Sequence, residues 1–506
     1  MMQLTAFPVL LPLVAGFILL FARMGGLKLQ RALNLLITIG LIFVSIEMLK
    51  VANTGAIEVY LSGNWIAPFG IVFVLDRLSA LMIFITAILA LGSLWYAIAT
   101  NYDAKGSHFH VLFQLQVFGL NGAFMTGDLF NLFVFFEVML LASYGLLLHG
   151  GGRLRTKAGL HYVVINMIGA TLFLFAVGAL YGATGTLNIA DMAVKIAEAP
   201  AENRALIAAA GLLLLVVFGI KAAMFPLYLW LPTAYANTSA PVAALFAIMT
   251  KVGIYSIIRA HGTIFGDDAG DLAFYYAPWV LGLGIITLAL AALGVLAARG
   301  LREQVAYLVL ASVATLLIGV GIATPAAISA TIYYMVHSTL IAGGMFLLAD
   351  VIARGRGDTD DRFESSPIMA NGVMIGSAFM FGAIAMTGMP PLSGFFGKML
   401  ILGAAMDHAW LAAIFAVVLI ASLLSIVAMA RSGSLLFYRT QPSEQAPGEP
   451  LNKSAFVAVA ALFATAPIMI IFAHPITAYT DLVAAQVFDA ASYIDAVLST
   501  PATERK

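Results

Sequence analysis

Apolar runs of about twenty residues recur along this chain, and each is about long enough to cross a lipid bilayer as a helix. The stretch ALIAAAGLLLLVVF (205–218) lies within one of them. Since 62% of the 506 residues are hydrophobic and only 10% are charged, a soluble core cannot account for so many runs. The sequence predicts an all-α polytopic membrane protein, because helices satisfy their own backbone hydrogen bonds in lipid.

Windows of this length predict about fourteen spans. They cover residues 4–22, 30–50, 71–98, 109–125, 127–148, 158–184, 204–236, 239–261, 273–298, 303–323, 326–352, 368–406, 409–438 and 453–473. Two of these windows are too long, because a straight helix over 204–236 would extend about 50 Å through a hydrocarbon core of about 30 Å. Pro226 and Pro232 lie inside the first, and Pro390, Pro391 and Gly394 lie inside the second, 368–406. Since proline removes a backbone donor, we expect two broken helices.

Lysines and arginines are distributed unevenly between the two sets of connections. One alternate set carries fifteen of them, and the opposite set together with the C-terminal tail carries six. Because cytoplasmic loops carry the positive excess, both termini are predicted to lie on the periplasmic side. We expect a single transmembrane domain over residues 1–474. Residues 475–506 are predicted to form an amphipathic helix or tail on the periplasmic side.

Four charged side chains and one histidine are predicted to lie at mid-membrane depth. They are Glu137, Lys221, Lys251, His337 and Lys398. Charge in hydrocarbon is costly, so such residues usually pair with one another or serve a function. Taken singly, each has a structural alternative. Glu137 and Lys221 can form a fixed ion pair, the other two lysines can extend to the interface, and the histidine can be a packing residue.

Other polar residues near span ends suggest structural roles. Asp128 precedes its helix and is expected to cap the N-terminus. Asp76 and Arg77 are expected to be structural or interfacial, whereas Asp350 and His261, at span ends, are expected to be solvated.

Together, the mid-membrane groups favour a proton relay. Three lysines and one carboxylate cannot all neutralise one another in pairs. Burial disfavours the ammonium form, so buried lysines can release protons, and a histidine can pass them on. Broken helices typically line the polar sites of transporters. We therefore expect water to reach these groups along a path through the membrane.

The composition excludes several other kinds of chemistry. The chain has no cysteine, which removes disulfides, thiolate metal sites and iron–sulfur clusters. No nucleotide loop, haem ligand set or metal cluster is visible, so no cofactor and no metal site are expected. A formal net charge of zero gives no reason to expect a nucleic acid partner.

Three segments resemble a known group of membrane subunits. They are GDLFNLFVFFEVMLLASYGLL (127–147), GIKAAMFPLYLWLPTAYANTSAPVAALFAIMTKVGIY (219–255) and GMPPLSGFFGKMLIL (388–402). These segments are similar to the antiporter-like subunits of respiratory complex I, and closer still to the D subunits of multisubunit Mrp-type cation/proton antiporters. The resemblance implies fourteen helices with two inverted five-helix repeats, helices 4–8 and 9–13, in which helices 7 and 12 are broken.

The resemblance also implies roles for individual residues. It places proton-transferring groups at Glu137 on helix 5, Lys221 on helix 7, Lys251 on helix 8, His337 on helix 11 and Lys398 on helix 12. The resemblance leads us to expect a proton-translocating subunit of a Na+ (or K+)/H+ antiporter in the bacterial inner membrane, a transporter rather than an enzyme. Its expected partners are the other subunits of the complex, protons, monovalent cations and the lipid bilayer.

Two alternatives stay open. The chain can be a proton-pumping subunit of complex I or of a membrane-bound hydrogenase, driven by redox chemistry in other subunits. Lys398 favours the antiporter, because the otherwise nearest complex I subunit carries glutamate there. The chain can also be a structural subunit without an ion path, which predicts a dry interior around Lys251.

Overall fold

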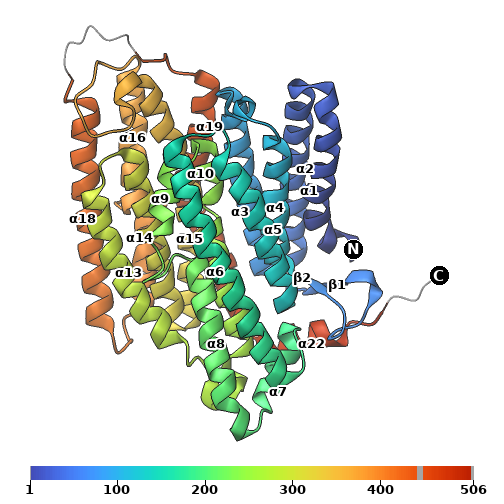
Figure 1. Cartoon of the computed structure of the whole chain (residues 1–506). Helices are drawn as coiled ribbons and strands as arrows, with labels where there is room; N and C mark the ends of the chain where they lie inside the picture. The colour runs from blue at the N-terminus through green and yellow to red at the C-terminus, as the bar shows by residue number, and fades with distance from the viewer. Residues whose placement is uncertain (1, 441–447, 503–506) are drawn as a thin grey trace.

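Long helices that run nearly parallel make up most of the molecule (Figure 1). The computed structural model describes residues 2–440 and 448–502. The first half contains α1 (Met2–Ala22), α2 (Leu27–Asn53), β1 (Glu58–Leu61), β2 (Val72–Leu75), α3 (Arg77–Ala99), α4 (Phe109–Met125), α5 (Leu129–Leu148), α6 (Arg153–Thr184), α7 (Ile189–Ala197), α8 (Ala201–Lys221), α9 (Trp230–Asn237), α10 (Ala240–Phe246) and α11 (Met249–Ser256). The second half contains a π-helical turn, η4 (Ile257–His261), then α12 (Gly262–Ile264), α13 (Ala277–Ala297), α14 (Leu301–Ile322), α15 (Pro325–Gly355), α16 (Gly372–Thr387), α17 (Ser393–Ala404), α18 (Leu411–Phe437), α19 (Lys453–Phe463), α20 (Thr465–Ile471), α21 (Ala473–Phe488) and α22 (Ala490–Ser499).

The helices confirm the polytopic all-helical class. Within the described residues, 12 spans are long and apolar enough to cross a membrane. The other two predicted spans correspond to α4, which has 17 residues, and to the shorter apolar helices α16 and α17. The count of fourteen and the inverted repeats stay predictions.

A small hairpin replaces the start of the third predicted span. β2 pairs with β1 in antiparallel register, with Glu58 opposite Leu75. The window 71–98 therefore began too early, because its first apolar residues form a strand. The hairpin, α7 and α22 lie at the same end of the bundle as the start of α1 (Figure 1).

Aspartates fix the starts of two spans. Asp76 precedes α3, and its carboxylate accepts a hydrogen bond from Ser79 N at 2.9 Å. Asp128 precedes α5 and accepts from Asn131 N at 2.8 Å, which confirms its predicted capping role. Both caps satisfy backbone donors that a helix start leaves free, so they set where each helix begins.

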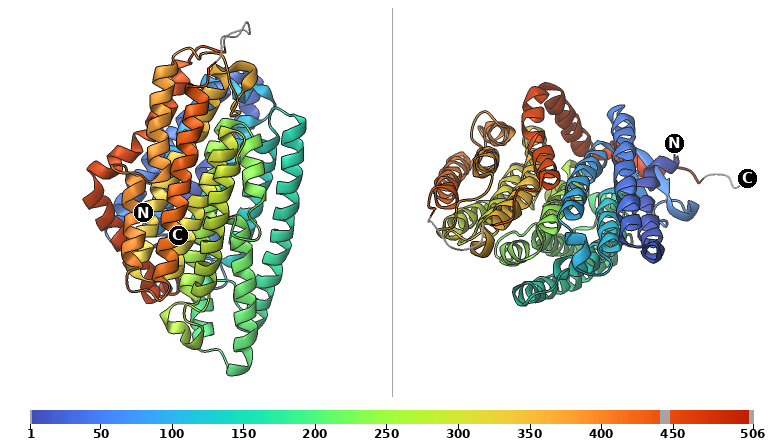
Figure 2. Two further views of the ribbon diagram at one scale, coloured as in Figure 1. Left: turned by 90° about the vertical axis from the view of Figure 1, so that its left-hand side faces the viewer. Right: turned by 90° about the horizontal axis from the view of Figure 1, so that it is seen from above.

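α15 occupies the interior of the bundle. It has 31 residues, and 94% of its most apolar window is buried. It packs against α3, α10, α14, α16, α17, α19 and α21. Seen from above, the bundle is elongated, with α1 and α2 at one end and α16 and α18 towards the other (Figure 2). The last helix, α22, contacts β1 near the N-terminal end. α15 therefore carries its polar residues into the core.

The C-terminal segment forms two helices rather than one. α21 and α22 meet at an angle of 69°, and Asp489 caps α22 by accepting from Ser492 N at 3.1 Å. α21 packs against α15 and α3. Val483 and Tyr493 are only 0% and 3% exposed, so much of the predicted apolar face lies against the chain itself.

Candidate functional site

The seventh predicted span is interrupted directly after Lys221. α8 ends at this residue, and α9 begins only at Trp230, with Pro226 in the irregular segment between them. The expected interruption at Pro232 is wrong, because this proline lies in the first turn of α9, where a backbone N–H has no helical acceptor. The Trp230 indole donates a hydrogen bond from Nε1 to the Ile220 carbonyl oxygen at 3.1 Å. The same carbonyl also accepts from Ala223 N at 3.1 Å, so the end of α8 keeps hydrogen-bond partners at the break. Lys221 thus lies at the C-terminal end of a half-helix, where the helix dipole favours a cation.

The ammonium group of Lys221 contacts a neutral amide. Its Nζ donates to Asn166 Oδ1 on α6 at 3.0 Å and lies 5.3 Å from the centre of the Phe136 ring. Glu137, on α5, is half-buried, and its charge acts on Lys221 without a direct ion pair. The predicted partners are therefore neighbours in this structure but not a closed salt bridge.

Lys251 is the most isolated of the predicted groups. It is 0% exposed, and its Nζ has no hydrogen-bond partner among the described residues. α11, which carries it, packs tightly on α8, since a Cβ added at Gly253 would lie 2.8 Å from Phe218 O. Glycine is required for this close approach. Lys251 thus lies on a segment that directly contacts the segment bearing Lys221.

The second predicted break separates α16 from α17. Pro390 and Pro391 lie between these two helices. Lys398, on α17, extends back to the break and donates from Nζ to Thr387 O at 2.8 Å and to Ser422 Oγ on α18 at 2.9 Å. Thr387 is the last residue of α16, so the ammonium group caps that helix and interacts favourably with its dipole.

His337, on α15, joins the two halves of the broken helix. Its Nε2 lies 3.1 Å from Ala385 O, and its Nδ1 lies 2.7 Å from Ser393 Oγ. Since a carbonyl only accepts, the neutral ring carries its hydrogen on Nε2, and Nδ1 accepts from the Ser393 hydroxyl. A Cβ added at Gly394 would lie 2.6 Å from Nε2. The glycine therefore permits the contact between α15 and α17.

A small polar cavity lies beside Lys398. Its volume is about 10 Å³, which is about the space that one water molecule requires. Lys398 and a set of hydroxyl groups contribute to its lining, namely Ser312, Thr315, Tyr334, Ser422 and Ser425. The Tyr334 ring stacks on His337 with 5.8 Å between ring centres. Tyr334 thus contacts both the cavity and the histidine.

The structure brings the predicted residues together in two groups. Lys221 and Lys251 lie on contacting segments near Glu137, whereas His337 and Lys398 meet at the second break. No hydrogen bond joins the groups, because Lys251 Nζ has no partner among the described residues.

Sequence reasoning missed the neutral partners Asn166, Ser393 and Ser422, because it considered only charged groups and histidine. Asn166 had a usable signal, since it is the one amide in the apolar stretch VVINMIGATL (163–172).

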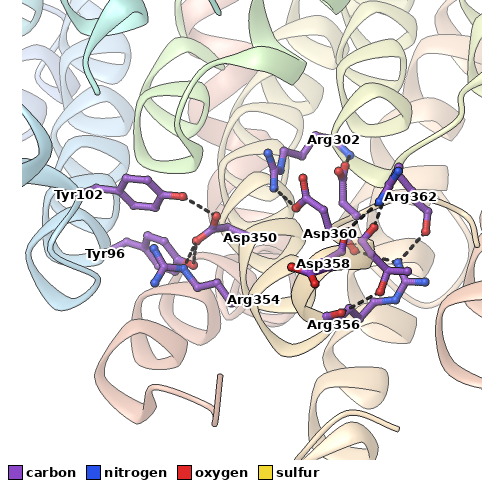
Figure 3. A network of polar contacts seen from close by, with 11 residues as sticks. Tyr96, Tyr102, Arg302, Asp350, Arg354, Arg356, Asp358, Asp360 and Arg362 are labelled. Atoms are coloured by element: carbon purple, nitrogen blue, oxygen red, sulfur yellow. Dashed lines mark hydrogen bonds and ion pairs between the residues drawn. The ribbon is translucent and has the colours of Figure 1, made fainter. Parts of the chain in front are cut away.

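A polar network, rather than solvent, surrounds the end of α15 (Figure 3). Asp350 is 2% exposed, so its predicted solvation is wrong. Its carboxylate accepts from the hydroxyls of Tyr96 and Tyr102, both at 2.8 Å, and from Arg354 Nε at 2.8 Å. Tyr102 lies in the connection after α3, and burial together with the Asp350 charge raises its pKa to about 12. Neighbouring loops therefore cover this helix end.

A second buried network lies at the opposite end of the bundle. Arg259 lies in η4 and forms a buried ion pair with Asp76. Its guanidinium carbon lies 5.1 Å from the centre of the Tyr493 ring on α22. His261, in the same turn, is 0% exposed, so its predicted solvation is also wrong. The imidazole lies against α8, with Nε2 at 2.9 Å from Gly211 O, and α7 and α21 pack over the adjoining α12.

Helices broken in the membrane, with buried ionisable side chains at the breaks, define a polytopic membrane protein of the ion-transporter class. The model of the family described as "NADH:quinone oxidoreductase/Mrp antiporter, TM" matches residues 126–425. The chain belongs to this family.

Individual relatives agree with this assignment. The D subunit of a probable K+/H+ antiporter from Rhizobium meliloti is 44% identical over 80% of this chain and 79% of the relative. The D subunit of a Na+/H+ antiporter from Alkalihalophilus pseudofirmus is 36% identical over 98% of this chain and 100% of the relative. Among solved structures, a chain of the Mrp complex from Dietzia sp. is 27% identical, with a TM-score of 0.86 over 98% of this chain and 99% of that chain.

Proposed function

We propose that this chain is a proton-translocating membrane subunit of a multisubunit antiporter that exchanges Na+ or K+ for protons. The names of the two relatives, both D subunits of cation/proton antiporters, support this role. The observation that carries the proton role is Lys251, which is fully buried and has no hydrogen-bond partner among the described residues. A lone amine in the core destabilises the fold, so its presence is best explained by a function.

The proposed path starts at Glu137 and Lys221. Closing this pair favours the ammonium form of the lysine, and opening it frees a proton for Lys251 on the contacting segment. The side-chain proximity of Glu137 to Lys221 and the tight packing of α11 on α8 support this step.

The second part of the proposed path runs from His337 to Lys398. Nδ1 of His337 can accept a proton once the Ser393 hydroxyl rotates to accept instead of donate. A water molecule in the small cavity then connects this region with Lys398. In this proposal Pro226, Pro390 and Pro391 keep both breaks open.

We further propose the bacterial inner membrane as the location, with both termini on the periplasmic side. The excess of lysine and arginine in one set of connections supports this orientation. The domain over residues 1–474 spans the membrane, and residues 475–506 lie on the periplasmic side. The proposed partners are the other subunits of the antiporter.

The experiment that tests the function is cation-dependent proton exchange in vesicles containing the complete complex, with Na+ and with K+. Lys221→Ala and Glu137→Ala should abolish exchange while the complex still assembles, and Lys398→Ala should reduce it by roughly tenfold or more. Wild-type rates in both Lys221→Ala and Glu137→Ala would refute the mechanism.

A redox-driven complex is the second candidate. A chain of respiratory complex I from Thermus thermophilus is 24% identical with a TM-score of 0.76, a similarity that shows the fold alone. Purification of the intact complex separates the two candidates, because flavin and iron–sulfur subunits would copurify only in the redox case.

A further inference from the structure

The amide of Asn166 accepts a hydrogen bond from the Lys221 ammonium group. Asn166 is 1% exposed, and its Nδ2 donates to the Tyr162 carbonyl oxygen one helical turn earlier, at 2.8 Å. This bond directs Oδ1 towards Lys221 Nζ, 3.0 Å away. A neutral acceptor on α6 therefore satisfies the lysine without supplying a counter-charge.

Two groups that can accept from Lys221 lie on neighbouring helices. Asn166 is on α6, and Glu137 is on the adjacent α5, directly after the Phe136 ring over which the ammonium group lies. The two helices are joined at one level by Ser143 and Tyr162, whose hydroxyls are 2.9 Å apart. The lysine is bonded to the amide and not to the carboxylate, so the structure represents the open form of the predicted pair.

The same arrangement occurs at the second break. Lys398 donates to Ser422 Oγ on the unbroken helix α18 and to a backbone carbonyl, and neither acceptor is charged. Both lysines at the breaks are thus held by a neutral side chain of a neighbouring unbroken helix. This recurrence argues that the neutral contact is part of how each lysine works.

We propose that Asn166 is a positioning residue that holds Lys221 away from Glu137, so that the lysine alternates between the amide and the carboxylate. This inference rests on the proposed proton-transfer function. The amide stabilises the open form, in which Lys221 is free to give its proton to the next group. Without it, the carboxylate is the acceptor that remains, and the closed pair dominates.

The surrounding elements carry other titratable groups that a pH experiment must consider. They are Glu137 and Tyr144 on α5, Tyr162 on α6, Lys251 on α11 and His261 on η4. Glu137 is the one carboxylate of this set, and its charge is the one that acts on Lys221. A change in the pH profile on altering Asn166 therefore reports on the Lys221–Glu137 pair.

The test compares exchange by the complete complex carrying Asn166→Leu, Asn166→Asp or Asn166→Gln. Asn166→Leu should lower exchange by roughly tenfold and move the pH of half-maximal exchange upward by about one unit, because the closed pair holds its proton more tightly. Asn166→Asp gives Lys221 a permanent counter-charge and should lower exchange further. Asn166→Gln keeps a neutral oxygen and should restore the profile towards that of the wild type.

A structural measurement tests the role of Asn166 even if the Asn166→Leu variant loses exchange for another reason. Electron cryo-microscopy of the complex carrying Asn166→Leu should show Lys221 Nζ in contact with the Glu137 carboxylate. Thr171→Val is the matched control, because Thr171 is an exposed residue of α6 whose hydroxyl bonds only the Met167 carbonyl. It should leave both the exchange and its pH profile unchanged.

The possible failures are distinguishable. If Lys221→Ala abolishes exchange but Asn166→Leu keeps the wild-type pH profile, or leaves Lys221 apart from Glu137, then the role of Asn166 is overturned. If Lys221→Ala itself exchanges at the wild-type rate, the proposed function fails first.

Discussion

Lys251 differs from the two lysines at the helix breaks because it has no acceptor in the part of the chain that the structure describes. Lys221 and Lys398 each donate to neutral oxygens, whereas Lys251 Nζ is buried with no hydrogen-bond partner among the described residues. An unsatisfied buried polar group costs about 1–3 kcal/mol, and a charged group costs more. The structure therefore contains a destabilising residue at the centre of the proposed path.

Replacing Lys251 by methionine should separate stability from function. Lys251→Met removes the unsatisfied amine and keeps the length of the side chain. We expect it to stabilise the complex by about 1–3 kcal/mol and to abolish cation-dependent exchange. Thermal unfolding of the purified complex and vesicle exchange measure the two effects.

Lys50→Met is the control for Lys251→Met. Lys50 is an exposed lysine whose Nζ pairs with Glu47 at 2.7 Å. Its replacement should change neither the unfolding temperature nor exchange by much. Exchange at the wild-type rate by Lys251→Met would contradict its assigned role.

His149 provides a pH-dependent contribution to stability. It follows α5, its Nε2 donates to Tyr102 O at 2.9 Å, and burial lowers its pKa below 6.5. A lowered histidine pKa contributes stability that is present above about pH 6.5 and is lost as the pH falls towards the folded-state value. His149→Gln keeps a donor for the carbonyl but does not titrate. Its unfolding temperature should therefore fall less than that of the wild type between about pH 7.5 and 5.5, and an equal fall would contradict this assignment.

At the scale of elements, the second break depends on a close approach of three helices. His337 bonds Ala385 near the end of α16 and Ser393 at the start of α17, and Gly394 provides the space. The position of the break is therefore set by side chains from outside the broken helix as well as by its prolines.

Gly394→Ala should disturb this arrangement. Its added methyl group would lie 2.6 Å from His337 Nε2, so α17 must shift. We expect a loss of about 1–3 kcal/mol in stability and a large loss of exchange. Gly403→Ala is the control on the same helix, because its methyl group would meet nothing within 4 Å. The control should stabilise the helix by up to about 1 kcal/mol and leave exchange intact, and equal effects of both substitutions would contradict the interpretation.

The breaks were predictable from the sequence, whereas two other features were not. Pro226, Pro390 and Pro391 cannot continue a helical hydrogen-bond ladder, so their effect is local. The segment VFVL at 72–75 is apolar enough for either a helix or a strand, and only its pairing with β1 decides. The bend at Asp489 depends on how α21 and α22 pack against the bundle.

The candidate functional site was also only partly predictable from the sequence. Mid-membrane lysines and a carboxylate are conspicuous in an apolar sequence, because each carries a large desolvation cost. Asn166 and Ser422 cost less to bury, so their sequence signal is weaker, and their roles depend on contacts with distant residues. Similarly, the residues that bury Asp350 and His261 belong to segments far from them in the sequence.

At the scale of the whole molecule, α22 packs against segments that lie much earlier in the sequence. Tyr493 covers Arg259, which pairs with Asp76 at the start of α3. The ring is 3% exposed, yet its hydroxyl has no hydrogen-bond partner among the described residues. The packing of the ring, rather than its hydroxyl, therefore holds α22 in place.

Substitutions at Tyr493 should distinguish these two contributions. Tyr493→Ala removes the ring and should destabilise the fold by about 3–5 kcal/mol. Tyr493→Phe removes only an unsatisfied hydroxyl and should lie within about 1 kcal/mol of the wild type. Limited proteolysis at the C-terminus, together with thermal unfolding, measures both. Comparable losses in the two variants would show that the hydroxyl matters after all.

The absence of a hydrogen-bond partner for Lys251 Nζ among the described residues also leads to a prediction about related sequences. We expect an aliphatic residue at this position to cost the fold less than the amine does, so the proposed proton transfer is what accounts for the amine. A homologue with leucine or methionine at the equivalent position should assemble normally but leave the proton gradient intact. The residue at this one position should therefore distinguish relatives that translocate protons from relatives that do not.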